Sequence, residues 1–317
     1  MEAGVFSIKK RRRGISGVPK SRTLQPRSKA LARQETITAY LFLLPSLFFF
    51  ITFVIVPMFM CVFNSFFDYT STSFTFSGLE NYTRMFKDPV FIKALKNTVL
   101  IVAVSVPVVV IFSLWVASAI YNMGEVALSF YRCVFYLPVV TGSVAVTVVW
   151  KWMFNKYTGL FNYVLKSGGV IEQNISFLGD ERFAIWCIII ILLTTSVGQP
   201  IVLYVSALGN VDKTLVEAAQ VDGATDLQTF WRIKWPSIMP TTLYVLVITT
   251  INSFQCFALI ELLTSGGPNN STQTIMYYIY YVVFKLDQFG YGNAMGVILA
   301  LIIAVFSAIQ FKLGSQE

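Results

Sequence analysis

The stretch EAAQVDGATDLQTFWRIKWPSIMP, residues 217–240, is the most informative part of this chain for predicting its fold and function. It holds three acidic residues, one glycine, two tryptophans and two prolines, yet it lies between two long apolar stretches. Capping residues, glycine and proline mark turns and helix ends rather than the interior of an apolar helix. The stretch therefore indicates a structured insertion with a role of its own.

The rest of the chain is unusually apolar. Of 317 residues, 56% are hydrophobic and 13% are charged, and the mean hydropathy is +0.66, whereas a soluble domain carries roughly 25% charged residues. A helix needs about 20 consecutive apolar residues to cross the hydrocarbon core of a membrane. Six stretches reach this length: about 39–67, 97–120, 133–153, 184–208, 238–263 and 291–311. The sequence thus predicts an integral membrane protein.

The apolar stretches are expected to be helices. Every backbone amide must be paired inside the bilayer, so only helices and closed barrels span it, and barrel strands would alternate over about ten residues. We therefore expect an all-α integral membrane protein with six transmembrane helices and a cytoplasmic helix-turn-helix loop. Residues 1–38 are expected to form a basic tail and residues 39–314 the transmembrane domain, with the loop at 212–236.

The N-terminal tail sets the expected orientation in the membrane. It contains ten lysines and arginines, including the run KKRRRG, and basic residues beside a span favour the cytoplasmic side. With six spans, both termini and the loops near 121–132 and 209–237 are then cytoplasmic. Outside the tail, nine basic residues fall on the outer side under this assignment and five on the inner side, so the assignment depends on the tail.

The residues that the chain lacks exclude several kinds of chemistry. It has no histidine, which removes Ser-His-Asp and Cys-His catalysis and histidine metal ligands. Its four cysteines lie in apolar stretches without metal-ligand spacing, and no G-x-x-x-x-G-K-[ST] loop is present to bind ATP phosphates. Glu261 is the only acid within the predicted spans, whereas ion-driven carriers usually place acids or bases there. If the protein is a transporter, its energy must then come from elsewhere, unless it is a passive pore.

Residues 212–236, which we call the elbow, are predicted to form two short helices joined by a tight turn. Thr214 and Glu217 have the spacing of a capping box that starts a helix at about 215–222. Gly223 then ends this helix, since glycine adopts a left-handed conformation at low cost. Thr225 and Gln228 form a second capping box, which opens a helix that is expected to end before Pro236, with Pro240 opening the next span.

The elbow is expected to present two different sides. Ala218 and Ala219 leave a face without bulk, to which another surface can come close. Phe230, Ile233 and Trp235 supply an apolar side that can pack under the helices. The alternative interpretation is a well-capped loop that merely joins two spans.

The elbow resembles the signature loop of the permease subunits of binding-protein-dependent ATP-binding-cassette (ABC) importers. The shared pattern is E-A-A-x-x-D-G-A, then a phenylalanine, then I-x-x-P and a second proline. Its members here are Glu217, Ala218, Ala219, Asp222, Gly223, Ala224, Phe230, Ile233, Pro236 and Pro240. Trp235 departs from the pattern, in which leucine usually precedes the proline. Residues 39–314 are similar to the carbohydrate-uptake branch, the maltose and glycerol-phosphate type, in segments such as ELLTSGGPNNSTQTIMYYIY.

The resemblance implies a MetI-like permease fold and a set of partners. A cytoplasmic ATPase dimer would bind ATP and Mg²⁺ and receive the elbow, so this chain would hold no cofactor and would not be an enzyme. The other partners would be a second homologous permease subunit, an extracytoplasmic solute-binding protein and the lipid bilayer, with no nucleic acid. The chain would carry a sugar or oligosaccharide across the cell membrane by alternating access.

The substrate site is expected in the spans on either side of the elbow. A neutral polyol needs a few well-placed polar groups in a mostly apolar wall. Polar residues gather at Thr194, Thr195, Ser196, Gly198, Gln199 and Tyr204 before the elbow, and at Asn252, Ser253, Gln255 and Cys256 after it. The predicted substrate residues are Thr194, Gly198, Gln199, Asn252, Ser253, Gln255 and Cys256. Polar side chains also join membrane helices by hydrogen bonds, which is the alternative role of each.

Two other functions stay open at this point. The first is an importer permease for a non-sugar solute, such as glycerol phosphate or an amino acid, with the same elbow. The second is an ATP-independent channel or ion-coupled carrier, against which both the elbow and the scarcity of acids in the spans argue.

Overall fold

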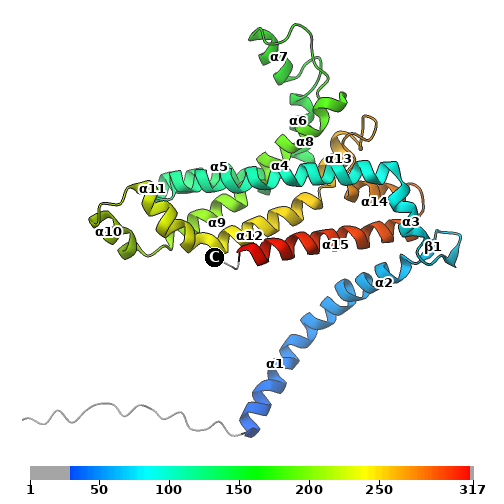
Figure 1. Ribbon diagram of the computed structural model, residues 1–317, viewed down its shortest axis with the longest axis horizontal. Coiled ribbons are helices and arrows are strands. Elements are labelled where there is room, and N and C mark those ends of the chain that lie inside the picture. Colours follow the sequence, from blue (N-terminus) through cyan, green and yellow to red (C-terminus); the bar gives the residue numbers. More distant parts are fainter. Residues whose placement is uncertain (1–28, 315–317) are drawn as a thin grey trace, which may run out of the picture. The chain divides into compact units, whose positions relative to one another are not determined.

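A computed structural model describes the backbone of residues 29–314 and the side chains of residues 36–314. The first 28 residues of the predicted basic tail lie outside the described residues. Apart from one two-stranded hairpin, the described chain consists of helices and the turns between them (Figure 1). The expectation of an all-α protein is confirmed.

The described residues fall into two compact units, which are divided between Pro57 and Met58. Helix α1 (Lys29–Phe50) runs through a π-helical turn, η1 (Ile51–Ile55), into α2 (Val56–Asn64), which continues into the second unit. The π-helical turn ends two residues before Pro57, whose missing N–H cannot continue the regular hydrogen-bond ladder. The continuous helix Thr36–Asn64 is long and apolar enough to cross a membrane.

The second unit holds three more helices of spanning length and two bent pairs. The long helices are α4 (Pro89–Ile120), the continuous run of α11 (Asp226–Thr229), η2 (Phe230–Lys234) and α12 (Trp235–Phe254), and α15 (Phe289–Gly314). The bent pairs are α5 (Glu125–Val140) with α6 (Ser143–Met153), at 94°, and α8 (Glu181–Ser196) with α9 (Gly198–Gly209), at 41°. In the described part of the chain, four helices can therefore span a membrane, or six if each bent pair is one span.

The two bent pairs differ from the straight spans that the sequence predicts. The stretch 133–153 turns by 94° at Gly142, which has an extended conformation with φ −56° and ψ 143°. Pro138 lies four residues earlier and removes a backbone hydrogen bond from the last turn of α5, which makes it easier for the helix to end there. The stretch 184–208 bends by 41°, just before Pro200, for the same reason.

The fifth predicted span, 238–263, is also interrupted. Helix α12 ends at Phe254, and a separate short helix, α13 (Ala258–Leu263), follows. Between them the hydroxyl of Thr274 donates to the carbonyl of Cys256 over 2.9 Å. A side chain from elsewhere in the chain thus satisfies a carbonyl that a continuous helix would bond to its own next turn.

Short elements connect the long helices. They are the antiparallel strands β1 (Phe67–Tyr69) and β2 (Phe74–Phe76), and the helices α3 (Glu80–Lys87), α7 (Leu160–Ser167), α10 (Lys213–Val221) and α14 (Ile275–Phe284). Of these, only α10 is predicted by the sequence, because the others are too short for an apolar period to identify.

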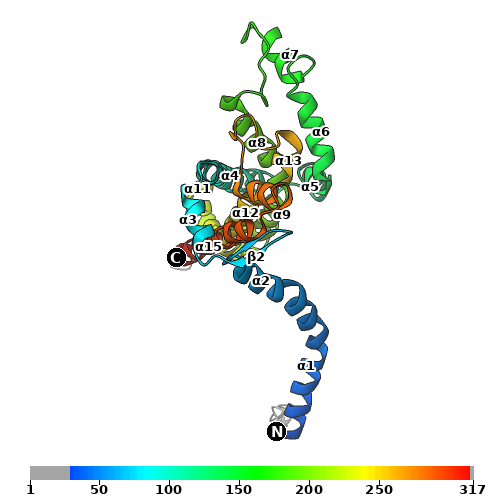
Figure 2. The ribbon, with the colours of Figure 1, turned by 90° about the vertical axis from the view of Figure 1, so that its right-hand side faces the viewer.

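Helix α4 is the centre of the second unit and packs against α8, α9, α12 and α14. Figure 2 shows α4, α9, α12 and α15 gathered together when viewed along the bundle. Two buried hydroxyls reinforce the packing: Ser105 of α4 bonds Ser253 of α12 at 3.0 Å, and Ser113 donates to the carbonyl of Val197 over 3.3 Å. Polar links of this kind are common between membrane helices.

Candidate functional site

The first helix of the elbow, α10, starts earlier than the sequence predicts. Its N-cap is Asp212, whose carboxylate accepts the N–H and the hydroxyl of Thr214, both at 2.8 Å. Those two bonds lower the pKa of Asp212, the hydroxyl having the larger effect. The predicted capping box from Thr214 to Glu217 is therefore wrong. Aspartate and threonine are both good N-caps, and the aspartate two residues upstream takes the position, which leaves Glu217 on the exposed surface of the helix.

The turn of the elbow has the predicted left-handed glycine. Gly223 has φ +80°, its N–H donates to the carbonyl of Gln220 over 3.0 Å, and the next N–H, of Ala224, donates to Ala219 over 2.9 Å. This pair of bonds is a Schellman motif, which ends a helix and fixes the direction of the chain after it. An added Cβ at Gly223 would meet no atom within 4 Å, so the backbone conformation, and not crowding, requires glycine here.

The second arm of the elbow begins as predicted and ends differently. Thr225 accepts the N–H of Gln228 over 3.3 Å, and the Gln228 side chain accepts the N–H of Thr225 over 2.9 Å, which confirms the capping box. The helix does not stop before Pro236 but continues to Phe254. A π-helical turn, in which the Trp235 N–H bonds the Phe230 carbonyl, shifts the hydrogen-bond register just before the proline, so its missing N–H is tolerated.

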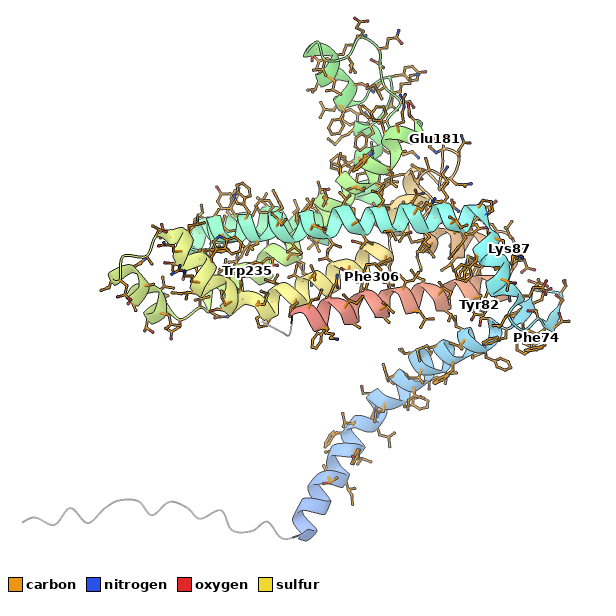
Figure 3. All side chains as sticks on the ribbon, in the orientation of Figure 1. Phe74, Tyr82, Lys87, Glu181, Trp235 and Phe306 are labelled. Atoms are coloured by element: carbon orange, nitrogen blue, oxygen red, sulfur yellow. The ribbon has the colours of Figure 1, made fainter. Side chains whose placement is uncertain are left out.

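The elbow exposes most of the residues that the resemblance marks as contact residues. Exposed members are Glu217, Ala218, Asp222, Gly223 and Pro236, and partly buried members are Ala219, Ala224, Phe230 and Ile233. Trp235 packs against the apolar core around α4 and α9 (Figure 3), as the apolar side of the elbow is expected to do.

Apolar side chains that the sequence analysis did not single out also lie on the elbow surface. Val221 is 87% exposed, and Leu215, Leu227 and Trp231 are exposed as well. Exposed apolar residues on one polar segment are typical of a surface that another protein covers. The sequence could have indicated this surface, because the elbow contains more apolar residues than the three, Phe230, Ile233 and Trp235, that were predicted to pack under the helices.

The base of the elbow is joined to the end of α4. The Lys234 ammonium donates to the Tyr121 hydroxyl over 2.6 Å and lies 5.2 Å from the centre of the same ring. Tyr121 is the C-cap residue of α4. The segment that carries the elbow is thus connected to two long helices, α12 by the chain and α4 by this pair.

Two of the predicted substrate residues meet in one polar cleft. Gln199 and Asn252 line a cavity of about 160 Å³ between α8, α9 and α12. The remaining lining residues are Val139, Thr195, Ser196, Pro200, Leu203, Tyr244, Val245, Ile248 and Thr249. The cavity has polar groups from three helices on a mostly apolar wall, which is the composition expected for a small-solute site.

Three other predicted substrate residues have structural contacts instead. Gly198 is buried where an added Cβ would lie 2.3 Å from the Phe135 carbonyl, so glycine lets α5 and α9 approach. Ser253 is buried against Ser105, and Cys256 belongs to the apolar core. None of the three lines the cleft. Gly198 and Ser253 directly adjoin Gln199 and Asn252, but neighbouring positions on a helix point in different directions.

The last two predicted residues do not line the cleft either. Thr194 bonds the Ile191 carbonyl over 2.7 Å and lines a separate hollow with Pro138 and Trp150. Gln255 is the exposed C-cap residue of α12. Conversely, Tyr244 and Thr249 line the cleft but were not among the predicted substrate residues. Thr249 could have been found from its spacing, because it lies three residues before Asn252 and so on the same helix face.

A larger hollow of about 570 Å³ lies between α6 and α7 and contains none of the predicted substrate residues. It is lined by Trp152, Tyr157, Tyr163 and polar residues around them. Within residues 36–314, no group of three cysteine, aspartate or glutamate side chains is placed to hold a metal ion.

The end of the bundle away from the elbow is closed by a network around Asp88. This residue caps α4 by accepting the Val90 N–H over 2.8 Å, and it accepts the hydroxyls of Tyr278 and Tyr291 over 2.6 and 2.8 Å. Burial raises the pKa of Asp88, but these hydrogen bonds lower it by more, so it lies below its usual value. The Arg84 guanidinium stacks 4.4 Å from the centre of the Tyr291 ring.

The loop before α14 is tied to the same end. Asn97 donates its amide to the carbonyls of Asn270 and Gln273 over 3.1 and 3.0 Å, and the Thr98 hydroxyl accepts the Ile275 N–H over 3.0 Å. Lys93 also donates to a carbonyl of this loop. Side chains of α4 therefore hold the loop in place, and its residues 271–274 are buried.

The chain is similar to known transport proteins over most of its length. Residues 86–314 match the family described as "Binding-protein-dependent transport system inner membrane component". The probable ABC transporter permease protein YurN of Bacillus subtilis is 33% identical over 293 residues, covering 90% of this chain and all of the relative. The multiple sugar-binding transport system permease protein MsmF of Streptococcus mutans is 32% identical, covering 87% and 94% of the two chains.

A solved structure shares the fold. One chain of a bacterial ABC transporter involved in the import of the acidic polysaccharide alginate superposes with a TM-score of 0.76 at 23% sequence identity. The match covers 90% of this chain and 97% of that chain. The same arrangement of helices is thus found in a solved ABC importer.

Proposed function

Because the chain belongs to the family of binding-protein-dependent transport system inner membrane components, we propose that it imports a sugar or oligosaccharide as the permease subunit of an ATP-driven ABC transporter. The observation that carries the proposal is the elbow. It is a rigidly capped pair of helices with an exposed apolar surface, directly continuous with a long apolar helix. Such a segment can receive a push from another protein and pass it to the membrane-spanning part.

The driving subunit in this proposal is a separate cytoplasmic ATPase dimer that binds ATP and Mg²⁺. The chain itself is a multi-pass membrane transport component, and in this proposal it binds no cofactor of its own. Glu217, Ala218 and Asp222 on the exposed side of α10 would meet the ATPase, together with the exposed Val221 and Leu227. Closure of the ATPase dimer would move the elbow and reorient the helices from inward to outward access.

The solute would pass the cleft at Gln199 and Asn252. The amide groups of these residues, with the hydroxyls of Thr195 and Thr249, can bond sugar hydroxyls, and the ring of Tyr244 offers an aromatic face. The residues that line this cleft are uncharged, which suits a neutral solute. The names of several relatives support a sugar as the solute. Two of them are MsmF and the lactose transport system permease protein LacF of Rhizobium radiobacter, which is 31% identical over 285 residues.

The remaining partners follow the same pattern. A second, homologous permease subunit would complete the translocation path, and an extracytoplasmic solute-binding protein would deliver the sugar. One solved relative is an alginate ABC transporter in complex with an alginate pentasaccharide-bound periplasmic protein, which supports the assignment of such a partner. The N- and C-termini would be cytoplasmic, so a reporter that is active only outside the cell should stay silent when fused after Lys312.

A second candidate is a solute with an anionic group. Arg132 lines a hollow of about 460 Å³ that shares Gln199 and Leu203 with the cleft, and charged residues inside a membrane segment often mark a transport path. Two relatives of this chain are named sn-glycerol-3-phosphate transport system permease protein UgpA. Replacing Arg132 by methionine should abolish uptake of a phosphate ester if this candidate is right, and leave sugar uptake in place if it is wrong.

The proposal is tested by uptake of labelled solutes into vesicles that contain the whole transporter. Gln199→Leu and Asn252→Leu should each reduce sugar uptake at least severalfold, because an apolar side chain leaves sugar hydroxyls unpaired, while basal ATP hydrolysis persists. Gln173→Leu, the same change on an exposed loop residue, should have no effect. Unchanged uptake in both cleft variants would move the solute path elsewhere, and uptake that continues after ATP depletion would exclude an ABC importer.

A further inference from the structure

The β1–β2 hairpin carries its aromatic side chains on one face. The register pairs Phe67 with Phe76 and Tyr69 with Phe74, so the four rings share one side of the ribbon. Asp68 and its partner Thr75 lie on the opposite side. The Phe67 ring is 4.4 Å from the Phe74 ring and 5.4 Å from the Phe76 ring, centre to centre, which makes one continuous aromatic surface.

The hairpin is held firmly at the end of the bundle where α15 begins. The Asn81 amide donates to the Phe67 carbonyl over 2.9 Å, and the same carbonyl lies only 2.0 Å from the position of a Cβ on Gly290. The Ser71 N–H donates to the Asp287 carboxylate over 2.9 Å. The aromatic surface therefore has a fixed position relative to α3 and to the first turn of α15.

Two of the rings protrude from this fixed support. Phe74 is 52% exposed and Phe76 is 74% exposed, and Figure 3 shows Phe74 at the same end of the bundle as Tyr82 and Lys87. Exposed aromatic rings grouped on a rigid surface usually mark a contact with a partner or a membrane. Within the described chain, neighbouring residues leave more than half of the Phe74 and Phe76 side chains uncovered, so this contact is with something outside the chain.

The aromatic surface is continuous with a helix that spans the membrane. The Phe67 ring lies 4.8 Å from the ring of Phe63, which is exposed near the end of the spanning helix Thr36–Asn64. On the other side, the Tyr69 ring lies 5.0 Å from Phe289, the first residue of α15. The aromatic side of the hairpin thus touches the last turn of one helix of spanning length and the first residue of another.

We propose that the aromatic face of the β1–β2 hairpin lies in the boundary between lipid headgroups and acyl chains and anchors this end of the permease to the bilayer. Aromatic side chains favour this boundary, and amphipathic surface elements bury their apolar side there while the polar side faces water. The hairpin has this division, with rings on one side and Asp68 and Thr75 on the other. The ligand of the surface is lipid, and the proposal depends only on the membrane location of the chain.

A protein partner on the same side of the membrane is the competing occupant. The continuity of the rings favours lipid, because Phe76 contacts Phe67, and Phe67 contacts Phe63, an exposed residue of a helix long and apolar enough to cross a membrane. The two occupants can be distinguished by what a reactive group on the hairpin captures.

The experiment places the photoreactive residue p-benzoylphenylalanine at position 74, 75, 76 or 63 of the whole transporter in lipid nanodiscs, with the solute-binding protein present. Only complexes that co-purify with the ATPase are irradiated, and adducts are identified by mass spectrometry. Position 63 is the reference for lipid contact, and position 75 is the matched control on the polar face of the same strand.

The proposal predicts that positions 74 and 76 yield lipid adducts at a level comparable to position 63 and severalfold above position 75. Three results would overturn it: adducts mainly to a protein subunit at positions 74 and 76, equal lipid adducts at 75 and 76, or lipid adducts at 63 alone.

Discussion

The two ends of the helical bundle keep their shape by different means (Figure 1). In the elbow, the bonds of Asp212, Gly223 and Thr225 all join residues within five positions of each other. At the far end, Asp88 is bonded by Tyr278 and Tyr291, which are 190 and 203 positions away. The elbow is therefore shaped by its own sequence, and the far end by contacts between helices.

This difference suits different mechanical roles. A segment with local bonds keeps its conformation even when the helices around it move, and it leaves its side chains available to a partner. An end joined by bonds between α4, α14 and α15 moves as one block, because no helix can leave it without breaking a hydrogen bond. In the proposed transporter, the elbow would receive the motion and the far end would keep three helices together.

The largest expected effect comes from breaking the local shape of the elbow. Gly223→Val places a β-branched residue at φ +80°, which costs about 1–2 kcal/mol or more and would shift the turn away from this geometry by about tenfold or more. We expect uptake to fall to background while the protein still inserts into the membrane. The measurement is sugar uptake and sugar-stimulated ATP hydrolysis in vesicles, together with co-purification of the ATPase.

The matched control is Gly223→Asn at the same position. Asparagine enters the left-handed region more readily than other residues, and the site has open space for its Cβ, so most of the uptake should survive. Equal loss in both variants would mean that the glycine is needed for close contact with the ATPase rather than for the turn. Normal transport in the valine variant would reduce the elbow to a connecting loop.

Locally encoded features of the elbow were predictable from the sequence. The left-handed Gly223 and the capping box at Thr225 depend on residues at most a few positions apart, and both predictions are confirmed. The start of α10 was missed because two capping residues compete within three positions. Its continuation through Pro236 was missed because a π-helical turn has no distinct sequence signal.

Contacts between helices could be predicted less well. Gln199 and Asn252 meet in one cleft as expected, because each is a polar residue in a span next to the elbow. Ser253, the neighbour of Asn252, is turned into the core; a single residue step rotates a side chain by about 100° around the helix. Pairs such as Asn97 with Gln273 join positions 176 apart, and a single sequence holds no record of such a pairing.

A second prediction concerns the hydrogen bond between Lys234 and Tyr121, which, like the bonds at the far end, joins residues distant in the sequence. Tyr121 and Lys234, 113 positions apart, link the base of the elbow to α4. Tyr121→Phe removes the hydroxyl but keeps the ring under the ammonium, so the elbow should keep its shape and still bind the ATPase. If α4 takes part of the load, the amount of sugar transported per ATP hydrolysed should fall severalfold.

The control for this link is Tyr131→Phe, the same change on an exposed tyrosine of α5. Lys234→Arg, which keeps the charge and can still donate to Tyr121, should restore part of the coupling lost in Lys234→Met. An unchanged ratio of transport to hydrolysis in Tyr121→Phe would show that α12 alone transmits the motion.

The smallest effect is expected at the far end, where Asp88→Asn tests the charge and not the shape. Asparagine is as good an N-cap as aspartate, so α4 should still begin at Pro89. The variant weakens the two tyrosine bonds, because bonds to a carboxylate are stronger than bonds to an amide, and about 1 kcal/mol of stability should be lost for this partly exposed group.

Since the pKa of Asp88 is lowered in the folded protein, the stability that its carboxylate contributes is present above the usual aspartate pKa of about 3.9 and is lost as the pH falls through the folded pKa. The thermal unfolding midpoint of the wild type should therefore exceed that of Asp88→Asn by a few degrees at pH 7, and the gap should shrink below about pH 4. Transport per ATP should be the same in both proteins. A gap that does not change with pH would mean that the ionised carboxylate is not what holds Tyr278 and Tyr291, and a loss of coupling without a loss of stability would show that the far end takes part in transmission and is not only a clamp.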